Sequence, residues 1–157
     1  TTRSPLGELV YQLKYRNNDT ADQIGEVIME YLGQIQPSLS RIDMVISVPA
    51  STPRVNQPVN RVAEAVARKL GLSFHSEAIQ RARTTSELKN VFEVEKRREL
   101  LDGAFQVDSE QVRGKSILLI DDLYRSGATA NAVTLALHKA DAARVYFLAV
   151  TRTRSNA

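Results

Sequence analysis

Residues 117–129 read ILLIDDLYRSGAT. Four apolar residues predict a strand that is buried on both faces, and Asp121 and Asp122 follow them directly. A short polar turn around Gly127 then leads into a helical pattern. A buried strand that runs through a glycine turn into a helix is typical of a parallel α/β sheet. Polar side chains at the carboxyl end of such a strand indicate a ligand site.

The rest of the chain alternates between helical and extended patterns. Apolar spacing predicts helices over 6–16, 21–35, 59–70, 95–101 and 128–140, and strands over 42–48, 72–79, 104–107, 116–123 and 144–151. Asp19 or Thr20 is suited to cap the second helix, Gly71 to end the third, and the charged residues 80–93 predict a long loop. We therefore expect an α/β fold with a parallel sheet and helices on both faces. The first two helices sit on that sheet or form a separate cap.

Composition sets the broad class of protein. The chain has 157 residues, 43% of them hydrophobic and 25% charged, which suits one domain over 1–157. It contains no cysteine, so disulfides and thiolate metal sites are excluded, and a reducing, cytoplasmic location is expected. No apolar run has the length of a membrane span, so no membrane partner is expected. The net charge of +3 shows no basic stripe with interleaved aromatic residues, which makes nucleic acid the least expected partner.

The residues of the opening stretch suit a phosphorylated sugar. Carboxylates such as Asp121 and Asp122 accept hydrogen bonds from sugar hydroxyls or lie near a hard cation. Amides at a helix N-terminus bind phosphate, and the hydroxyls of Ser126 and Thr129 add donors beside Gly127. The set fits a ribose 5-phosphate. On residue types alone, an aspartate-capped strand end with a glycine turn stays an open alternative.

The order of residues in 117–129 resembles the phosphoribosyl-diphosphate motif of type I phosphoribosyltransferases at every place but one. Arg125 stands where that family usually has Thr or Ser. The resemblance extends over most of the chain and is greatest to the competence-protein-F-like (ComF-like) branch. Its further segments are Lys14-Tyr15, Val48-Pro49, Arg54–Gln57, Arg81–Thr84 and Ala104-Phe105.

The resemblance implies a task for each matched position of the opening stretch. Asp121 and Asp122 would act as catalytic residues that bind the ribose hydroxyls, with one of them near Mg²⁺, directly or through water. The 5-phosphate would be held by Ser126, Gly127, Ala128 and Thr129. Arg125 either reaches inward to this phosphate, which we favour, or points outward to solvent.

Two more segments gain tasks from the resemblance. Pyrophosphate would be held after the first strand by Ala50, Ser51, Thr52 and Arg54. Residues 81–90 would form a mobile flap whose cations neutralise the leaving pyrophosphate; these are Arg81 and the catalytic Arg83 and Lys89. A proline-punctuated turn and a solvated charge run are the respective alternatives.

The implied activity is transfer of the 5-phosphoribosyl group between phosphoribosyl diphosphate and a nitrogen base, with pyrophosphate as the other product or substrate. Its partners would be phosphoribosyl diphosphate or a nucleoside monophosphate, and a homodimer stays open. Residues 1–36 and the C-terminal tail would form a small hood. The alternative is a non-catalytic nucleotide-binding regulator or a DNA-uptake accessory protein. The branch's flap Gln and Asn are not found in register. Its zinc-binding cysteines are absent, so the zinc module is either lost or outside this sequence, which opens on Thr1.

Overall fold

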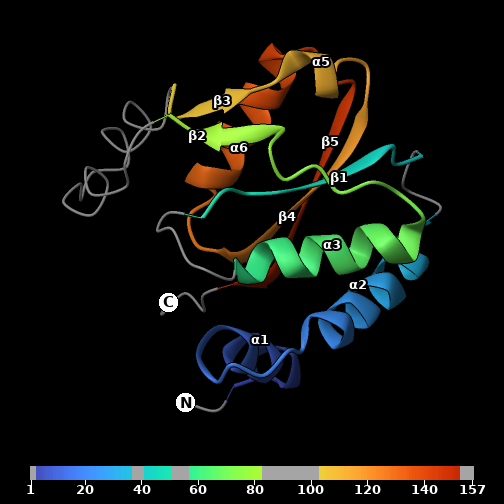
Figure 1. The fold of residues 1–157 in the computed structure, drawn as a ribbon, viewed down its shortest axis with the longest axis vertical. Helices are drawn as coiled ribbons and strands as arrows, with labels where there is room; N and C mark the ends of the chain where they lie inside the picture. Colours follow the sequence, from blue (N-terminus) through green and yellow to red (C-terminus); the bar gives the residue numbers. More distant parts are fainter. Residues whose placement is uncertain (1–2, 37–40, 51–56, 83–102, 153–157) are drawn as a thin grey trace.

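The computed structural model describes residues 3–36, 41–50, 57–82 and 103–152 (Figure 1). Its helices are α1 (Pro5–Tyr15), α2 (Ala21–Ile35), α3 (Pro58–Leu70), α5 (Ser109–Val112) and α6 (Ala128–Lys139). Its strands are β1 (Met44–Ser47), β2 (Ile79–Arg81), β3 (Phe105–Val107), β4 (Ser116–Tyr124) and β5 (Arg144–Arg152). The predicted helix over 95–101 and most of the predicted loop lie outside the described residues.

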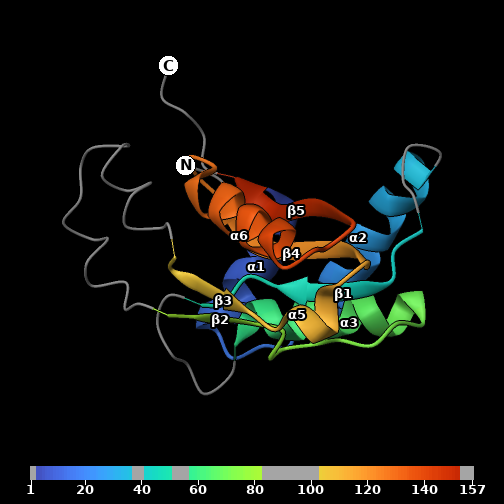
Figure 2. The same cartoon turned by 90° about the horizontal axis from the view of Figure 1, so that it is seen from above.

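A parallel sheet forms the centre of the fold, as predicted. β4 lies between β1 and β5, and both pairings are parallel (Figure 2). Ser47 at the end of β1 is in register with Ile120, so β4 continues beyond β1 with its two aspartates. The carboxyl end of β4 is therefore flanked on the β1 side by the chain that follows Ser47.

Alternate residues of β4 point into two hydrophobic clusters, one on each face of the sheet. Ile117 and Leu119 pack with side chains of α6, α5 and β3. Leu118 and Ile120 pack with side chains of α1, α2 and α3. Figure 1 shows these three helices together on one side of the strands. The prediction of helices on both faces is confirmed, and all four apolar residues are at most 1% exposed, which explains their uninterrupted hydrophobic run.

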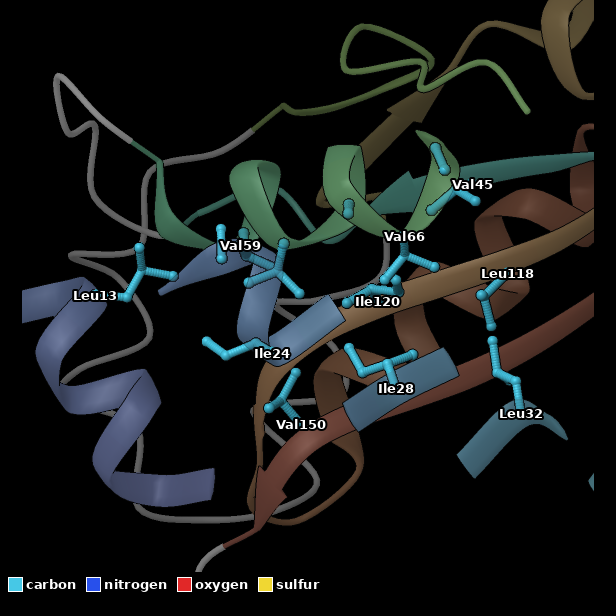
Figure 3. Packing of buried hydrophobic residues seen from close by; sticks show 14 residues of the cluster. Leu13, Ile24, Ile28, Leu32, Val45, Val59, Val66, Leu118, Ile120 and Val150 are labelled. Carbon is cyan, nitrogen blue, oxygen red and sulfur yellow. The ribbon is translucent and has the colours of Figure 1, made fainter. Parts of the chain in front are cut away.

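The two N-terminal helices pack on the same face of the sheet as α3 and share the hydrophobic core on that face. Leu13 of α1 and Ile28 of α2 belong to the cluster that contains Leu118, and the close-up in Figure 3 shows them with Val66 and Val150. Thr20 fixes the joint between the helices, because its buried hydroxyl donates a hydrogen bond to the Leu9 carbonyl at 2.6 Å. α1 is thereby held in a defined position over one edge of the sheet.

Three details differ from the prediction. The expected strand over 72–79 is wrong: only Phe74 bridges to Val45, a turn follows at 76–77, and β2 begins at Ile79. β2 also takes the first two residues of the predicted loop. It pairs antiparallel with β3, so these strands form a separate hairpin instead of extending the parallel sheet. The short helix α5 was not predicted; Asp108 caps it by accepting from the Glu110 amide at 3.1 Å.

The helix caps follow from local chemistry. Gly71 ends α3 with φ of +71°, as expected for a left-handed C-cap. Thr20 occupies the N-cap position of α2, while the neighbouring Asp19 carboxylate accepts from the Ala21 amide at 3.2 Å. Of the helices in the described ranges, none combines the length and the apolar character that crossing a membrane requires.

Candidate functional site

The acid pair stands at the carboxyl end of β4 and is held there by both neighbouring segments. The Val48 amide donates to the Ile120 carbonyl at 2.9 Å, just before the acids. On the other side Asp121 is in register with Ala149, and the Thr151 hydroxyl donates to the Asp122 carbonyl at 2.7 Å. The backbone that carries the acids is thus fixed before any ligand binds.

The two carboxylates have different partners. Asp121 folds back on the chain, and its Oδ1 accepts from the Asp122 amide at 2.8 Å. Asp122 points to α1, where its Oδ2 forms an ion pair with the Lys14 ammonium. Both side chains of this pair are mostly buried, with exposed fractions of 19% for Lys14 and 29% for Asp122. Adjacent residues of a strand point to opposite faces of the sheet, which accounts for this division.

Lys14 is a site residue that the sequence motifs do not indicate. It belongs only to the Lys14-Tyr15 segment that supports the family resemblance. The distance along the chain between Lys14 and Asp122 hides the contact, because only the packing of α1 brings them together. The residue before it, Leu13, is buried in the core, which was the available sign that this end of α1 faces inward.

The surroundings shift the pKa values of the two acids in opposite directions. Burial raises the pKa of Asp121 to about 7, and the neighbouring Asp122 carboxyl adds to this effect. Burial also opposes ionisation of Asp122, but its contacts with the Lys14 ammonium and with Asp121 outweigh burial and lower the pKa of Asp122. One acid of the pair therefore ionises readily while the other retains its proton toward neutral pH.

Arg81, at the end of β2, binds the chain that follows β1 and interacts electrostatically with Asp121. Its Nε donates to the carbonyls of Pro49 and Ala50 at 3.0 and 3.1 Å, and its guanidinium lies 4.9 Å from the centre of the Phe105 ring. Burial lowers the pKa of Arg81, and the negative charge of Asp121 partly offsets this. Arg81 is the last residue of β2, and its side chain holds the chain after β1. Nearly all the rest of the mobile flap predicted over 81–90 lies outside the described residues, so the flap stays a prediction.

The turn after the acids presents backbone amides at the start of α6. Gly127 occupies the N-cap position with φ of +82°, a left-handed conformation that glycine adopts without strain. The first helical hydrogen bond is donated by Asn131 to the Gly127 carbonyl, so the amides of Thr129 and Ala130 have no acceptor within the helix. Ser126 Oγ accepts from the Ala128 amide at 3.3 Å. This geometry is suited to hold an anion.

Arg125 and Tyr124 flank the same turn. The side chain of Arg125 is exposed, and the described part of the chain gives it no hydrogen bond or ion pair. Tyr124 tilts against Phe147 with ring centres 6.3 Å apart, and its hydroxyl lies beside Gly127. Arg125 is thus available to an anion at α6, and its inward or outward use stays a prediction.

The described residues bring together part of the predicted set. Asp121, Asp122, Arg81 and Ala50 lie near the carboxyl ends of β1 and β4, and the α6 turn follows β4 directly in the chain. The predicted site residues Ser51, Thr52, Arg54, Arg83 and Lys89 lie outside the described residues.

The chemistry of the acid pair fits a magnesium ion. Carboxylate oxygens are hard ligands, and Mg²⁺ usually takes one or two of them together with waters and substrate phosphates. Within the described ranges no group of three or more His, Cys, Asp or Glu side chains is suited to enclose a metal ion. Asp121 and Asp122 would supply two carboxylate ligands, and waters or substrate oxygens would supply the others.

Fold and site together define a parallel α/β protein whose carboxyl sheet edge combines an acid pair with an anion-binding helix start. The family model described as "Phosphoribosyl transferase domain" matches residues 20–157. The chain belongs to this family, which confirms the family expected from residues 117–129. The first described helix, α1, precedes the matched residues.

Curated relatives carry a name that does not state a transferase activity. The chain is 29% identical to the DNA utilization protein YhgH of Escherichia coli O157:H7 and 26% identical to the YhgH of Salmonella typhimurium LT2. Each alignment covers 95% of this chain and 68% of the relative. The predicted ComF-like branch agrees with these relatives.

Solved structures support the fold. Adenine phosphoribosyltransferase from Saccharomyces cerevisiae is similar with a TM-score of 0.59 and 15% identity, over 88% of this chain and 72% of the yeast chain. A structure titled as the allosteric regulatory enzyme of purine biosynthesis has a TM-score of 0.59 and 15% identity over 90% of this chain, which spans only 30% of that longer chain. The predicted type I phosphoribosyltransferase fold is confirmed.

Proposed function

We propose that the protein transfers the 5-phosphoribosyl group between phosphoribosyl diphosphate and a nitrogen base. The observation that carries the proposal is the direct succession of the acid pair and the α6 turn: carboxylates for vicinal hydroxyls stand next to amides for a 5-phosphate. A ribose 5-phosphate carries these two groups on one small ring. Family membership supports the same substrate class.

The residues divide the work as follows. Asp121 and Asp122 accept hydrogen bonds from the ribose hydroxyls and face the positive charge that grows on the ribose ring as its C1–oxygen bond breaks. The new bond joins C1 to the base nitrogen, pyrophosphate leaves with the bonding electrons, and the nitrogen loses its proton. Arg81, next to the chain that follows β1, adds positive charge on the pyrophosphate side.

Asp121 or Asp122 would hold magnesium, directly or through water, and the ion would neutralise negative charge on pyrophosphate. Ser51, Thr52 and Arg54, together with Arg83 and Lys89, belong to this proposal through the family motif alone. The acceptor base is left to experiment, because the described residues include no motif that specifies it.

A binding-only protein is the second candidate, and two observations favour it. The curated relatives are named DNA utilization proteins, and Arg125 replaces the hydroxyl residue usual at that place of the motif. A regulator that binds phosphoribosyl diphosphate or a nucleotide, or an accessory protein in DNA uptake, would keep the same phosphate and hydroxyl contacts without turnover.

The test is a screen of purine and pyrimidine bases with phosphoribosyl diphosphate and Mg²⁺, following pyrophosphate release. We expect release that depends on one class of base, because a transferase couples the two. In the variant Asp121→Asn with Asp122→Asn, release should stop and calorimetry should show weakened binding of phosphoribosyl diphosphate while the fold remains. Tight binding without release with any base would favour the binding-only candidate, and absence of both would contradict the proposed substrate.

A further inference from the structure

We propose that Lys14 is a positioning residue that acts as an internal cation of the site, so that Lys14 and a divalent cation compete for the Asp122 carboxylate. The inference deepens the proposed function and rests on it for the identity of the site. It starts from one contact, the ion pair between Lys14 Nζ and Asp122 Oδ2, which links α1 to the end of β4.

Lys14 is fixed in place, unlike an ordinary surface lysine. Its neighbour Leu13 is 8% exposed in the core, and the hydroxyl of Thr20 ties the start of α2 to the Leu9 carbonyl of α1. The exposed fraction of the Lys14 side chain itself is 19%. An ion pair that is held this way is screened less by water and salt than a surface pair.

The charge of the Asp122 carboxylate is already paired without a ligand. Lys14 contacts its Oδ2, and the positive charge of Arg81 acts on the neighbouring Asp121. A divalent cation that binds Asp122 must therefore replace the Lys14 ammonium at that oxygen. While Lys14 stays in place, it keeps Asp122 oriented toward α1 without a metal.

Lys14 lies outside the part of the chain that the family model matches. The match begins at residue 20, whereas Lys14 belongs to α1, which ends at Tyr15. An element outside the matched domain thus delivers a charge to the acid pair inside it. Changes in α1 can adjust the cation preference of the site without altering the 117–129 motif.

The experiment measures binding of Mn²⁺, as a paramagnetic substitute for Mg²⁺, to the full chain without any phosphoribosyl substrate. We expect Lys14→Met to bind Mn²⁺ about tenfold more tightly than the wild type, since a charge-assisted contact of about 1.5 kcal/mol corresponds to one decade. Lys14→Arg should restore affinity near the wild type. Arg16→Met is the matched control on the same helix: it also removes one positive charge, and its affinity should stay within about twofold of the wild type.

A double-mutant cycle makes the result specific to the pair. In an Asp122→Asn background, the further change Lys14→Met should leave Mn²⁺ affinity unchanged, because the shared carboxylate is gone. Equal affinities of Lys14→Met and Arg16→Met would overturn the proposal, as would a gain that persists with Asp122→Asn. Absence of Mn²⁺ binding in Lys14→Met is likewise a contradiction.

A measurement on the wild type covers the case in which Lys14→Met fails to fold. Mg²⁺ should release the Lys14 amine from Asp122 and so increase the rate at which Lys14 is reductively methylated. Mass spectrometry measures this rate. Equal rates with and without Mg²⁺ would contradict the competition. None of these readouts uses a nucleobase. If the transferase screen fails but the double-mutant cycle gives the expected Mn²⁺ affinities, the proposed activity is rejected and the proposed role of Lys14 still stands.

Discussion

At the scale of single residues, the site depends on how neighbouring positions of one strand meet different surroundings. Asp121 turns to its own backbone and to the charge of Arg81, while Asp122 turns to Lys14. The same side chain, placed on opposite sides of one strand, gains a raised pKa in one case and a lowered pKa in the other. Arg125, whose side chain is exposed, lies next in the chain to the turn at the start of α6.

The role of Arg125 is tested by Arg125→Thr, which restores the usual residue of the motif. We expect affinity for ribose 5-phosphate to fall by about tenfold, because a guanidinium that donates to phosphate contributes about 1.5 kcal/mol or more, and 1.4 kcal/mol is one decade. Calorimetric titration of both proteins at one ionic strength measures the change.

Arg113→Thr is the matched control for this substitution. Arg113 is also exposed but precedes β4, whereas Arg125 follows it, so the whole strand separates the two positions. The control should keep the wild-type affinity. Equal affinities of Arg125→Thr and the wild type would show that Arg125 points outward, and pyrophosphate release that appears only in Arg125→Thr would favour the binding-only candidate.

At the scale of elements, the junction between β4 and α6 depends on a backbone conformation. Gly127 has φ of +82°, and a Cβ built there would lie 2.6 Å from the Tyr124 hydroxyl. Tyr124 is in turn packed against Phe147 of β5. The turn that presents the α6 amides is therefore constrained both by its dihedral angle and by an aromatic neighbour.

Gly127→Ala should destabilise the protein and weaken phosphate binding together. The left-handed conformation costs a non-glycine residue about 1–2 kcal/mol, and the close approach to Tyr124 must also be relieved. Denaturant unfolding and titration with ribose 5-phosphate measure the two effects. Wild-type values in both measurements would contradict the constraint on this turn.

Gly33→Ala serves as the control within a helix. A Cβ at Gly33 meets nothing within 4 Å, and the residue lies in the last turn of α2. Alanine should therefore stabilise the protein by about 0.5–1 kcal/mol, because it is the better helix former. If Gly127→Ala lowers the free energy of unfolding and Gly33→Ala raises it, the loss at Gly127 comes from its backbone conformation and surroundings and not from adding a methyl group in general.

At the scale of the whole molecule, the pKa of Asp121 connects the site to global stability. Its pKa is raised from 3.8 to about 7, so the folded state prefers the protonated acid. The stability that this preference contributes is present below about pH 4 and is lost as pH rises to about 7. The lowered pKa of Asp122 affects protein stability in the opposite sense. Its contribution is present above the ordinary pKa of an aspartate and is lost as pH falls below that value.

Asp121→Asn should remove the loss of stability with rising pH. Asn keeps an oxygen for the Asp122 amide but cannot ionise, so the variant should gain in melting temperature over the wild type from about pH 4 to about pH 7. Thermal unfolding in the presence of EDTA measures this difference without metal. The exposed Asp141→Asn is the control, and a constant difference for Asp121→Asn across the range would contradict burial as the cause.

The sequence alone determined the parallel α/β class, the family and most elements. The run 117–120 is apolar because it is buried on both faces, and the order of residues through Thr129 encodes a local strand, turn and helix. Amphipathic helices are equally local: the predicted bounds of α2 agree with the structure, and those of α3 and α6 differ by one residue. Such features are readable because each depends on residues that are near one another in the chain.

The tertiary structure decided which distant charges meet. Lys14 reaches Asp122 only because Leu13 and its neighbours bury α1 against the core, and Arg81 reaches Ala50 only because β2 pairs antiparallel with β3. The strand predicted over 72–79 is wrong for the same reason. In the structure this segment has one bridge, to Val45, and a turn before β2 begins. Contacts of this kind depend on packing between elements, and no spacing within a single segment records them.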